Sequence, residues 1–347
     1  MRNILVTGGA GYIGSHTIIS LLKKRYNLTI IDSFKNSSPK VIERIKIINQ
    51  SYGSHLTFKR GDLRDKNFLN DLFQESKNNL RPIESVIHFS GLKSVAESKK
   101  IPLDYWEVNV CGTINLLMIM EKYNCKNLIF SSSATVYGEK NIPPFKETDT
   151  LNPINPYAKT KEVVEKILCD IYNSKKIKWN FTVLRYFNPI GAHSSGLIGE
   201  DPKSNSTNLF PIILNSVMKN EKLYVFGLDW PTTDGSCIRD YIHIEDLAEG
   251  HIKALENQFL NVNQFKCFNL GTGCGTSVLE LISIFEKVNN VKISYEISSR
   301  REGDTAILVA DNSYAKNKLN WYPLKSIDEM CKDGYRWILR NPNGYDD

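Results

Sequence analysis

The chain has 347 residues, of which 41% are hydrophobic and 24% are charged, so it can bury a sizeable core and does not have the composition of a disordered protein. Its net charge of +6 comes from scattered Lys and Arg residues, which argues against a nucleic-acid-binding tract and suits an anionic substrate. The seven cysteines include no CxxC pair, so we expect reduced thiols, no metal site and a cytoplasmic protein.

Short apolar runs alternate with helical patterns through the first half of the chain. The first run, Ile4–Thr7, is too short for a signal peptide or a membrane span and predicts a buried strand. Further strands are expected at Leu28–Ile31, Thr57–Lys59, Ser85–Phe89, Asn127–Phe130 and Phe181–Leu184, and helices at Gly14–Lys24, Lys66–Glu75, Tyr105–Tyr123 and Tyr157–Tyr172. This alternation predicts βαβ units and a doubly wound parallel sheet that is covered on both faces.

The pattern changes after about Asn188, where Pro, Gly and Asn become frequent and the apolar runs become shorter. Helices are expected at Asn208–Lys219 and Glu245–Asn257, and strands at Tyr224–Gly227 and Phe268–Leu270. We therefore expect an α/β protein with an N-terminal domain at residues 1–187 and a smaller α/β substrate lobe at residues 188–347. Some C-terminal segments of the lobe can return to the first sheet.

A glycine-rich turn lies between the first predicted strand and the first predicted helix. Gly8, Gly11 and Gly14 have the spacing GxxGxxG. The first glycine permits a sharp turn, the second a close approach to a pyrophosphate, and the third close packing of helix on strand. The free N–H groups at the helix N-terminus then face the phosphates. These features predict a Rossmann-type dinucleotide-binding domain.

A second glycine-rich turn, Gly271–Gly275, also follows a predicted strand, so the glycines alone do not locate the cofactor. Asp32 distinguishes the first turn, because it ends the second strand eighteen residues after Gly14, where a carboxylate can bind the ribose hydroxyls of NAD. Ser33 and Phe34 follow it, and no Arg stands there to bind a 2′-phosphate. NAD is therefore favoured over NADP, and the second turn is interpreted as structural.

Tyr157 and Lys161 are four residues apart, which places them on one face of a helix. A phenol with a reference pKa of about 10 is a poor base at neutral pH. A nearby ammonium and a cationic nicotinamide ring would favour its phenolate, which could take a proton from a substrate hydroxyl while hydride leaves to the cofactor.

The same spacing occurs at Tyr172 with Lys176 and at Tyr314 with Lys318, so further features are needed to choose among the three pairs. Tyr157 follows Pro156 at a predicted helix start on the N-terminal half. The run Ser131–Thr135 precedes it at the end of the fifth strand, on the side of a parallel sheet where ligands bind. A Ser hydroxyl from this run can hold the substrate oxygen.

With these motifs the sequence resembles the extended short-chain dehydrogenase/reductase superfamily, and within it the UDP-glucose 4-epimerases. The resemblance covers nearly the whole chain. Its most discriminating motifs are Ser133-Ala134-Thr135-Val136-Tyr137-Gly138 and Arg300-Arg301-Glu302-Gly303-Asp304, which occur together with Val6–His16, His88–Lys93, Leu184–Pro189 and Arg239–His243.

The resemblance implies a role for each candidate site residue. Tyr157 would be the acid and base, Lys161 would hold the nicotinamide ribose and Ser133 would bond the sugar O4. NAD would be bound by Gly8, Gly11, Tyr12, Ile13, Gly14, Asp32, Asn36, Ser37, Asp62, Leu63, Phe89, Ser90, Gly91, Lys93, Asn109, Tyr186 and Phe187. The UDP-sugar would be held by Asn188, Asn208, Leu209, Tyr224, Phe226, Arg239, Arg301 and Asp304, with Leu308 beside the sugar. Guanidinium groups suit a diphosphate on physical grounds as well.

The implied reaction interconverts UDP-glucose and UDP-galactose through a 4-keto sugar that rotates about its diphosphate between two hydride transfers. At Leu308 the family varies between a bulky aromatic and a small residue, a difference linked to acceptance of N-acetylated sugars, so activity on those sugars stays open. The resemblance also implies a homodimer paired through the helices at Tyr105–Tyr123 and Tyr157–Tyr172.

Three alternatives remain. A nucleotide-sugar 4,6-dehydratase would need an acidic pair after the hydroxyl residue, where Ala134 and Thr135 stand. A uronate epimerase or decarboxylase would need a basic group at the sugar C6, which we cannot identify. A non-enzymatic NAD-binding regulator would need the glycine turn but not Tyr157, Lys161 and Ser133.

Overall fold

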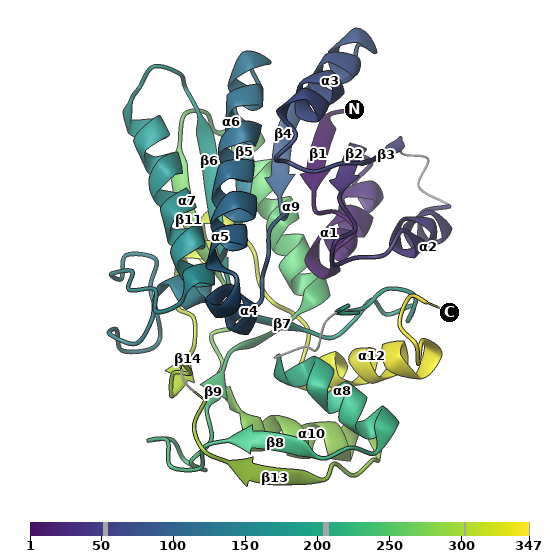
Figure 1. Ribbon diagram of the computed structural model, residues 1–347, viewed down its shortest axis with the longest axis vertical. Coiled ribbons are helices and arrows are strands. Elements are labelled where there is room, and N and C mark those ends of the chain that lie inside the picture. Colours follow the sequence, from purple (N-terminus) through teal and green to yellow (C-terminus); the bar gives the residue numbers. More distant parts are fainter. Residues whose placement is uncertain (51–54, 204–207, 302, 347) are drawn as a thin grey trace. The chain divides into compact units, whose positions relative to one another are not determined.

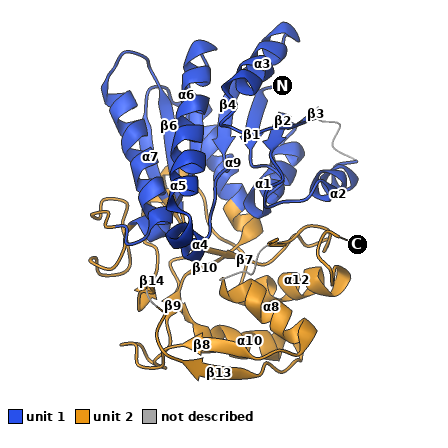
Figure 2. Cartoon of the chain, in the orientation of Figure 1, with its two compact units in different colours: residues 1–136, 153–185, 248–268 blue, residues 137–152, 186–247, 269–347 orange. Residues whose placement is uncertain are grey.

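The structure, a computed structural model, describes residues 1–50, 55–203, 208–301 and 303–346. It divides into two compact units, which Figure 2 shows in different colours. The first unit comprises Met1–Val136, Pro153–Arg185 and Ala248–Phe268, and the second comprises Tyr137–Asn152, Tyr186–Leu247 and Asn269–Asp347. The chain thus passes between the units several times, and one passage, at Arg185 and Tyr186, lies close to the predicted domain boundary.

The central sheet of the first unit has the strand order β11-β6-β5-β4-β1-β2-β3 within the described residues (Figure 1). The pairs β3–β2, β2–β1, β1–β4 and β4–β5 are parallel. The strands are β1 Asn3–Thr7, β2 Asn27–Asp32, β3 Leu56–Arg60, β4 Ile83–His88, β5 Asn127–Ser133, β6 Asn180–Tyr186 and β11 Phe265–Leu270. All the strands expected in the first half of the sequence are present, which confirms the Rossmann-type α/β fold.

Continuous apolar runs form these strands because helices cover both faces of the sheet. Leu5 and Ile31 belong to a cluster that is closed by Leu72 of α3, Leu116 of α6 and Val164 of α7. The helices of this unit are α1 Tyr12–Lys23, α2 Lys40–Ile48, α3 Lys66–Asn78, α4 Val95–Lys100, α5 Pro102–Tyr105, α6 Gly112–Lys122, α7 Pro156–Asn173 and most of α9 Ile244–Leu260.

One long helix was expected at Tyr105–Tyr123, but the structure divides this segment into three parts. A π-helical turn, η1 Trp106–Cys111, separates α5 from α6. The Thr113 hydroxyl donates to the Asn109 carbonyl over 2.6 Å, which satisfies a carbonyl at the irregular turn. π-helical turns that interrupt an α-helix are frequent at functional sites. The spacing of apolar residues in the sequence does not reveal them, because it does not record which backbone groups are hydrogen-bonded.

The described residues of the second unit form small sheets and separate helices. Its strands are β7 Asn188–Ile190, β8 Leu223–Phe226, β9 Ile238–Arg239, β10 Tyr241–His243, β12 Thr276–Ser277, β13 Tyr295–Ser298 and β14 Ile307–Leu308. They pair as β10–β7, β12–β9–β14 and β13–β8. The helices are α8 Leu209–Lys219, α10 Val278–Asn289, α11 Ser313–Leu319 and α12 Ile327–Arg340. In the first unit, a 3-10 turn, η2 Ala134–Val136, follows β5 and ends the segment Met1–Val136.

Across residues 1–50, 55–203, 208–301 and 303–346, no helix is both long and apolar enough to cross a membrane. The same residues contain no group of three or more His, Cys, Asp or Glu side chains arranged to hold a metal ion.

Candidate active site

The first glycine turn joins β1 to α1 and leaves no room for side chains. Gly8 has a φ of +67° and donates its N–H to the Ile31 carbonyl over 2.8 Å. A Cβ on Gly8 would lie 2.7 Å from the backbone nitrogen of Ser90, and a Cβ on Gly14 would lie 2.5 Å from the Gly8 carbonyl oxygen. Helix α1 begins at Tyr12 with Gly11 as its N-cap, so no side chain caps its first N–H groups. This is the geometry that a pyrophosphate needs.

Asp32 lies at the carboxyl end of β2 and ties the glycine turn to the loop that follows. One carboxylate oxygen accepts the Ala10 N–H over 3.0 Å. The other accepts the Phe34 N–H over 2.9 Å and the Ser37 hydroxyl over 2.8 Å. Asp32 and Ser37 are buried together, whereas Asn36 is exposed. The carboxylate therefore stands beside the turn, where a ribose would be bound.

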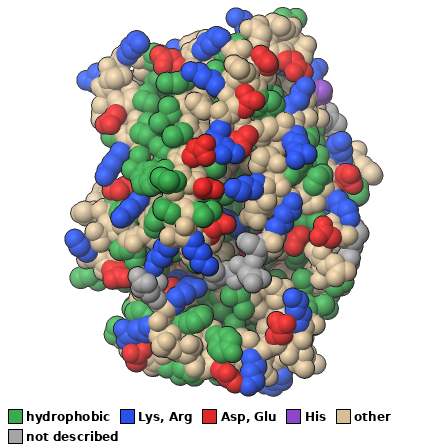
Figure 3. All heavy atoms as spheres, viewed as in Figure 1, with side chains coloured by type: hydrophobic (Ala, Val, Ile, Leu, Met, Phe, Trp, Pro, Cys, Tyr) green, Lys and Arg blue, Asp and Glu red, His purple; other side chains and the backbone are tan. Residues whose placement is uncertain are grey.

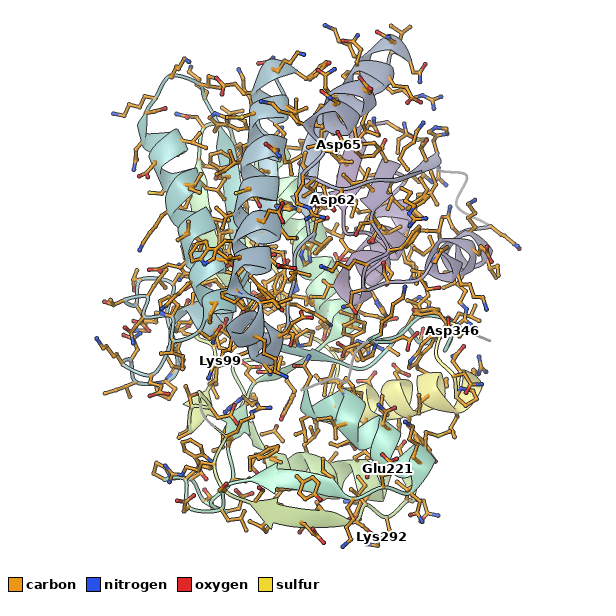
Figure 4. All side chains as sticks on the ribbon, viewed as in Figure 1. Asp62, Asp65, Lys99, Glu221, Lys292 and Asp346 are labelled. Carbon is orange, nitrogen blue, oxygen red and sulfur yellow. The ribbon has the colours of Figure 1, made fainter. Side chains whose placement is uncertain are left out.

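The residues expected at adenine lie on the segment between β3 and α3, where Figure 4 labels Asp62. The Asp62 carboxylate pairs with the Arg64 guanidinium over 2.8 Å. Hydrogen bonding from Arg64 is the main cause that lowers the pKa of Asp62. Leu63 is buried, and its carbonyl accepts from the Asn115 side chain over 3.3 Å. Asp62 is thus a fixed carboxylate, and Leu63 supplies an apolar surface.

The loop after β4 is fixed by backbone and side-chain bonds. Phe89 donates its N–H to the Thr7 carbonyl over 3.0 Å, and Ser90 donates to the Thr7 hydroxyl over 3.3 Å. Asn109 accepts the Leu92 N–H over 2.7 Å and donates to the Leu92 carbonyl over 3.1 Å. Gly91 lies beside this amide, and Lys93 is exposed. The loop is therefore held between the end of β1 and the π-helical turn.

A chain of buried hydrogen bonds connects this loop region with α7. His88 contacts the hydroxyl of Thr7 over 2.7 Å and that of Thr113 over 2.9 Å. Burial, followed by the charge of Lys161, lowers the pKa of His88 to about 3, so this histidine is neutral. Asn109 donates to the Thr160 hydroxyl over 3.0 Å.

Helix α7 places Tyr157 in its first turn. Asn155 caps the helix by accepting the Ala158 N–H over 2.9 Å, and Pro156 occupies the first helical position. The Tyr157 ring meets the Tyr105 ring edge-on at 6.5 Å. The Tyr105 hydroxyl is in turn 2.7 Å from the Ser94 carbonyl, which fixes that ring. Tyr157 is therefore oriented by both the cap and an aromatic neighbour.

Lys161 and Ser133 stand at the same strand end as Tyr157. The Lys161 ammonium donates to the Ser131 carbonyl over 2.8 Å and lies 5.9 Å from the centre of the Tyr157 ring. Ser133 forms a side-chain hydrogen bond with Tyr157. Its hydroxyl also accepts from the Thr135 hydroxyl over 2.9 Å. The structure thus brings together the three residues that the sequence singles out.

Burial controls the protonation of this group. It raises the pKa of Tyr157, and the hydrogen bond with Ser133 opposes that rise. Burial lowers the pKa of Lys161 to about 8, and the charge of Glu165 opposes that fall. Burial therefore favours the neutral phenol of Tyr157 in the chain by itself.

In the second unit, two predicted diphosphate ligands share one carboxylate. Arg301 forms bonds of 3.1 and 2.8 Å to the two oxygens of Asp304, and Arg239 approaches Asp304 at 3.8 Å. The Arg301 guanidinium also lies 5.5 Å from the centre of the Phe226 ring. Leu308 is the neighbour of Arg239 across the β14–β9 pair. Glu302, within the motif that carries Arg301, lies outside the described residues.

The remaining predicted residues occupy separate places in the second unit. Tyr186 and Phe187 are buried, and Asn188 begins β7. Asn208 is the N-cap of α8, and Leu209 is its first residue. Tyr224 lies in β8 and is exposed.

The second glycine turn is already filled by a side chain of the protein. The buried carboxylate of Asp240 accepts the N–H groups of Thr272 over 2.7 Å, Gly273 over 2.9 Å and Ala310 over 3.1 Å. A Cβ on Gly271 would lie 2.5 Å from this carboxylate. The turn binds an internal anion, which supports its interpretation as structural.

Comparisons with known proteins agree with this geometry. The family model described as GDP-mannose 4,6 dehydratase matches residues 5–334. A UDP-glucose 4-epimerase of Bacillus subtilis is 48% identical over 99% of this chain and 98% of its own length. One of Arabidopsis thaliana is 45% identical over 99% of this chain and 97% of its own length.

Two solved structures are similar over almost their whole length. A UDP-glucose 4-epimerase of Stenotrophomonas maltophila with bound NAD and formylated UDP-arabinopyranose has a TM-score of 0.93 and 42% identity, with 99% of each chain covered. One of Bifidobacterium longum in complex with NAD+ and UDP has a TM-score of 0.91 and 42% identity, and covers 99% of this chain and 100% of its own.

The fold and the Tyr-Lys-Ser group define an extended short-chain dehydrogenase/reductase. The matching family model is described by a dehydratase, whereas the relatives of 45–48% identity, matched over nearly their full length, are named UDP-glucose 4-epimerases. The chain belongs to the UDP-glucose 4-epimerase family.

Proposed function

We propose that this chain interconverts UDP-glucose and UDP-galactose with NAD as a bound cofactor. The observation that carries the proposal is the group formed by Tyr157, Lys161 and Ser133 at the carboxyl end of β5, in a unit whose first glycine turn leads into a helix with no side-chain cap. Family membership supplies the substrate class, because the relatives are named as UDP-glucose 4-epimerases.

Tyr157 removes the proton from the sugar O4 and returns it after the 4-keto sugar has rotated about its diphosphate. When bound, NAD would supply hydride transfer, from C4 in the first half of the reaction and back to the opposite face of the 4-keto sugar in the second. Ser133 holds O4 at hydrogen-bonding distance from the phenol. Lys161 contributes a positive charge beside that phenol and holds the nicotinamide ribose. The buried Tyr105 ring restricts the motion of Tyr157 between the two proton transfers.

The residues around the glycine turn fit a dinucleotide. A Cβ at Gly8 or Gly14 would overlap neighbouring backbone, so the tight turn into α1 requires glycine at both positions. Such a turn places a pyrophosphate at the helix N-terminus in dinucleotide-binding domains. Tyr12 and Ile13 open the helix whose N-terminus faces the phosphates. Asp32, with Asn36 and Ser37, binds the adenosine ribose, and Asp62 with Leu63 flanks adenine. The loop from Phe89 to Lys93, with Asn109, Tyr186 and Phe187, lines the rest of the cofactor.

In the second unit, Arg239 and Arg301 hold the diphosphate, and Asp304 keeps the two guanidinium groups in place before the substrate binds. Phe226 and Tyr224 offer aromatic surfaces to the nucleoside. Asn188, Asn208 and Leu209 complete this group. Binding energy from UDP, remote from C4, retains the keto intermediate while the sugar rotates.

Incubation of the purified protein with UDP-galactose tests the function. UDP-glucose should form without added reductant, and denaturation should release NAD and not NADP. A protein that contains NAD but leaves UDP-galactose unchanged would contradict the proposed reaction. Formation of a stable 4-keto-6-deoxy sugar would instead favour a dehydratase, for which Ala134 and Thr135 supply no acidic pair.

Leu308 is expected to influence the range of sugars. It is half-buried in β14 beside Arg239, and its side chain is smaller than an aromatic ring. Changing Leu308 to Tyr should lower kcat/KM for UDP-N-acetylglucosamine more than for UDP-galactose, because the ring would fill the space that an acetamido group needs. Parallel assays of both sugars check this ratio, and an unchanged ratio would remove Leu308 from sugar selection.

We also propose that two copies pair through α6 and α7. Figure 3 shows hydrophobic side chains gathered over these helices. Met118 of α6 is 50% exposed, and the partly buried Ile114, Val163 and Ile167 extend the same apolar surface. An exposed apolar patch of this kind marks an interaction surface.

The seven cysteines are free thiols, which suits the proposed cytoplasmic location.

Changing Met118 to Lys is expected to weaken this dimer, because a charge would enter its apolar centre. Light scattering across a range of protein concentrations should then show a larger monomer fraction. Changing Ile47 to Lys is the control, since Ile47 is 53% exposed on α2, away from the proposed contact. A wild-type protein that is monomeric at all concentrations would exclude the dimer.

A further inference from the structure

Three consecutive serines at the end of β5 meet three residues of α7 that are spaced four apart. Ser133 bonds Tyr157, and the Ser131 carbonyl accepts from the Lys161 ammonium over 2.8 Å. The Ser132 hydroxyl donates to the Glu165 carboxylate over 2.5 Å. Residues at i, i+4 and i+8 lie on one face of a helix, so Glu165 continues the face that carries Tyr157 and Lys161.

The Glu165 carboxylate is held from a second strand as well. Arg185 of β6 donates to one oxygen through Nε over 3.1 Å and to the other through an η nitrogen over 2.6 Å. The two side chains are 7% and 6% exposed. This two-point geometry fixes the carboxylate more firmly than a single contact would. Helix α7 is thereby locked in register against both β5 and β6.

A purely structural role does not explain why this contact is ionic. Burying two charges is costly, and replacing a buried ion pair by apolar residues of similar volume is often neutral or stabilising. The pair lies one helical turn from Lys161, so the negative charge also acts on the ammonium beside Tyr157. Position and charge therefore both connect Glu165 with the reaction.

We propose that Glu165, held by Arg185 and Ser132, is a positioning residue that sets the register of Tyr157 and Lys161 against the serines of β5 and provides a negative charge for the Lys161 ammonium. This inference rests on the proposed epimerase function, because it assigns a role within that same site. Glu165 itself acts through Lys161 and Tyr157 and touches neither sugar nor cofactor.

The groups that surround Lys161 define the direction in which loss of the Glu165 charge would shift the pKa of Lys161. Tyr157 and Glu165 face it from α7, and the neutral His88 approaches from β4. The Phe130 ring and the Ser131 carbonyl face it from β5, the uncharged Asn109 and Gly91 lie nearby, and Arg185 of β6 acts through Glu165. Burial lowers the pKa of Lys161 to about 8, and Glu165 opposes that fall. Removal of the carboxylate would therefore lower this pKa further.

The test changes Glu165 to Gln and measures kcat and KM for UDP-galactose from pH 6 to 10. Activity that needs the Lys161 ammonium is present below its pKa and lost above it. The alkaline limb of the kcat profile should therefore move to lower pH by about one unit or more. KM should stay near the wild-type value, because the proposed UDP ligands belong to the other unit.

Two further variants separate position from charge. Ser132→Ala keeps the ion pair and removes one contact, so kcat should fall while the alkaline limb stays in place. The double change Glu165→Met with Arg185→Met removes both charges with little change in volume, so it should fold even if Glu165→Gln does not. Its alkaline limb should move to lower pH, and by less than in Glu165→Gln, because no unpaired Arg185 remains.

Glu162→Gln is the matched control, since Glu162 forms an ion pair with Lys166 on the same helix, and Lys166 is exposed. It should reproduce the wild-type profile. If the folded Glu165→Gln protein, or the folded double variant, has the wild-type kcat and pH profile, the proposal is wrong. That result would leave the epimerase function intact, whereas a wild-type protein without activity on UDP-galactose would refute the function itself.

Discussion

Changing Tyr157 to Phe is expected to lower kcat for UDP-galactose by about 10²- to 10⁴-fold, the usual contribution of a positioned acid and base. The substitution removes only the hydroxyl, and the ring keeps its edge-on contact with Tyr105 at 6.5 Å. Burial raises the pKa of this phenol, so its action as a base depends on the positive charges of Lys161 and of bound NAD beside it. The measurement is the rate of UDP-glucose formation, with bound NAD and the melting temperature determined in parallel.

The chain supplies a matched control for this change. Tyr172 lies on the same helix with Lys176 at the same spacing, and its hydroxyl is 3.3 Å from the Asn263 carbonyl near the surface. Changing Tyr172 to Phe should leave kcat within a small factor of wild type. Near-normal activity of Tyr157→Phe, with NAD still bound, would remove Tyr157 from the acid and base role.

The central sheet could be predicted because its strands are continuous apolar runs. The β1 segment is buried at every position, and such a run has few other stable environments. Asp32 and Tyr157 could be located for a related reason, since the ends of parallel strands converge on one edge where ligands bind. The positions of these site residues in the first unit therefore follow from local sequence patterns and from their order along the chain.

Long-range partners could not be predicted in the same way. The bond between Asp240 and the second glycine turn joins residues that are 32 and 33 positions apart, and no periodic signal connects them. The ion pair of Glu165 with Arg185 joins a helix to a strand, and each residue alone resembles an ordinary surface charge. The sharing of Asp304 by Arg239 and Arg301 likewise depends on how three short segments fold together.

Other features did have a local signal. Helices α10 and α12 begin with capping boxes, in which Ser277 pairs with Glu280 and Ser326 pairs with Glu329. The S-x-x-E spacing marks such helix starts in a sequence. The π-helical turn at Asn109 has no comparable signature, because the apolar period continues through it.

Changing Gly8 to Asn is expected to weaken NAD binding strongly. Asn tolerates the left-handed backbone better than most residues, so the φ of +67° is not the main obstacle. The obstacle is space, because the new Cβ would lie 2.7 Å from the Ser90 nitrogen and 2.9 Å from its Cα, both backbone atoms of the cofactor loop. Overpacking of this kind costs about 1–3 kcal/mol, which corresponds to an affinity about 5- to 150-fold lower if the loop must move.

The second glycine turn provides the control with the same substitution and a similar backbone. Gly273 has a φ of +78°, but a Cβ there would meet its nearest neighbours at 3.5 Å, which is ordinary contact. Gly273→Asn should therefore retain NAD, as measured by the nucleotide released on denaturation and by titration of the cofactor-free protein. If Gly273→Asn lost the cofactor and Gly8→Asn kept it, the two turns would have exchanged roles. Loss in Gly8→Asn alone would show that the cofactor depends on the close approach of the first turn to Ser90, and not on a left-handed glycine as such.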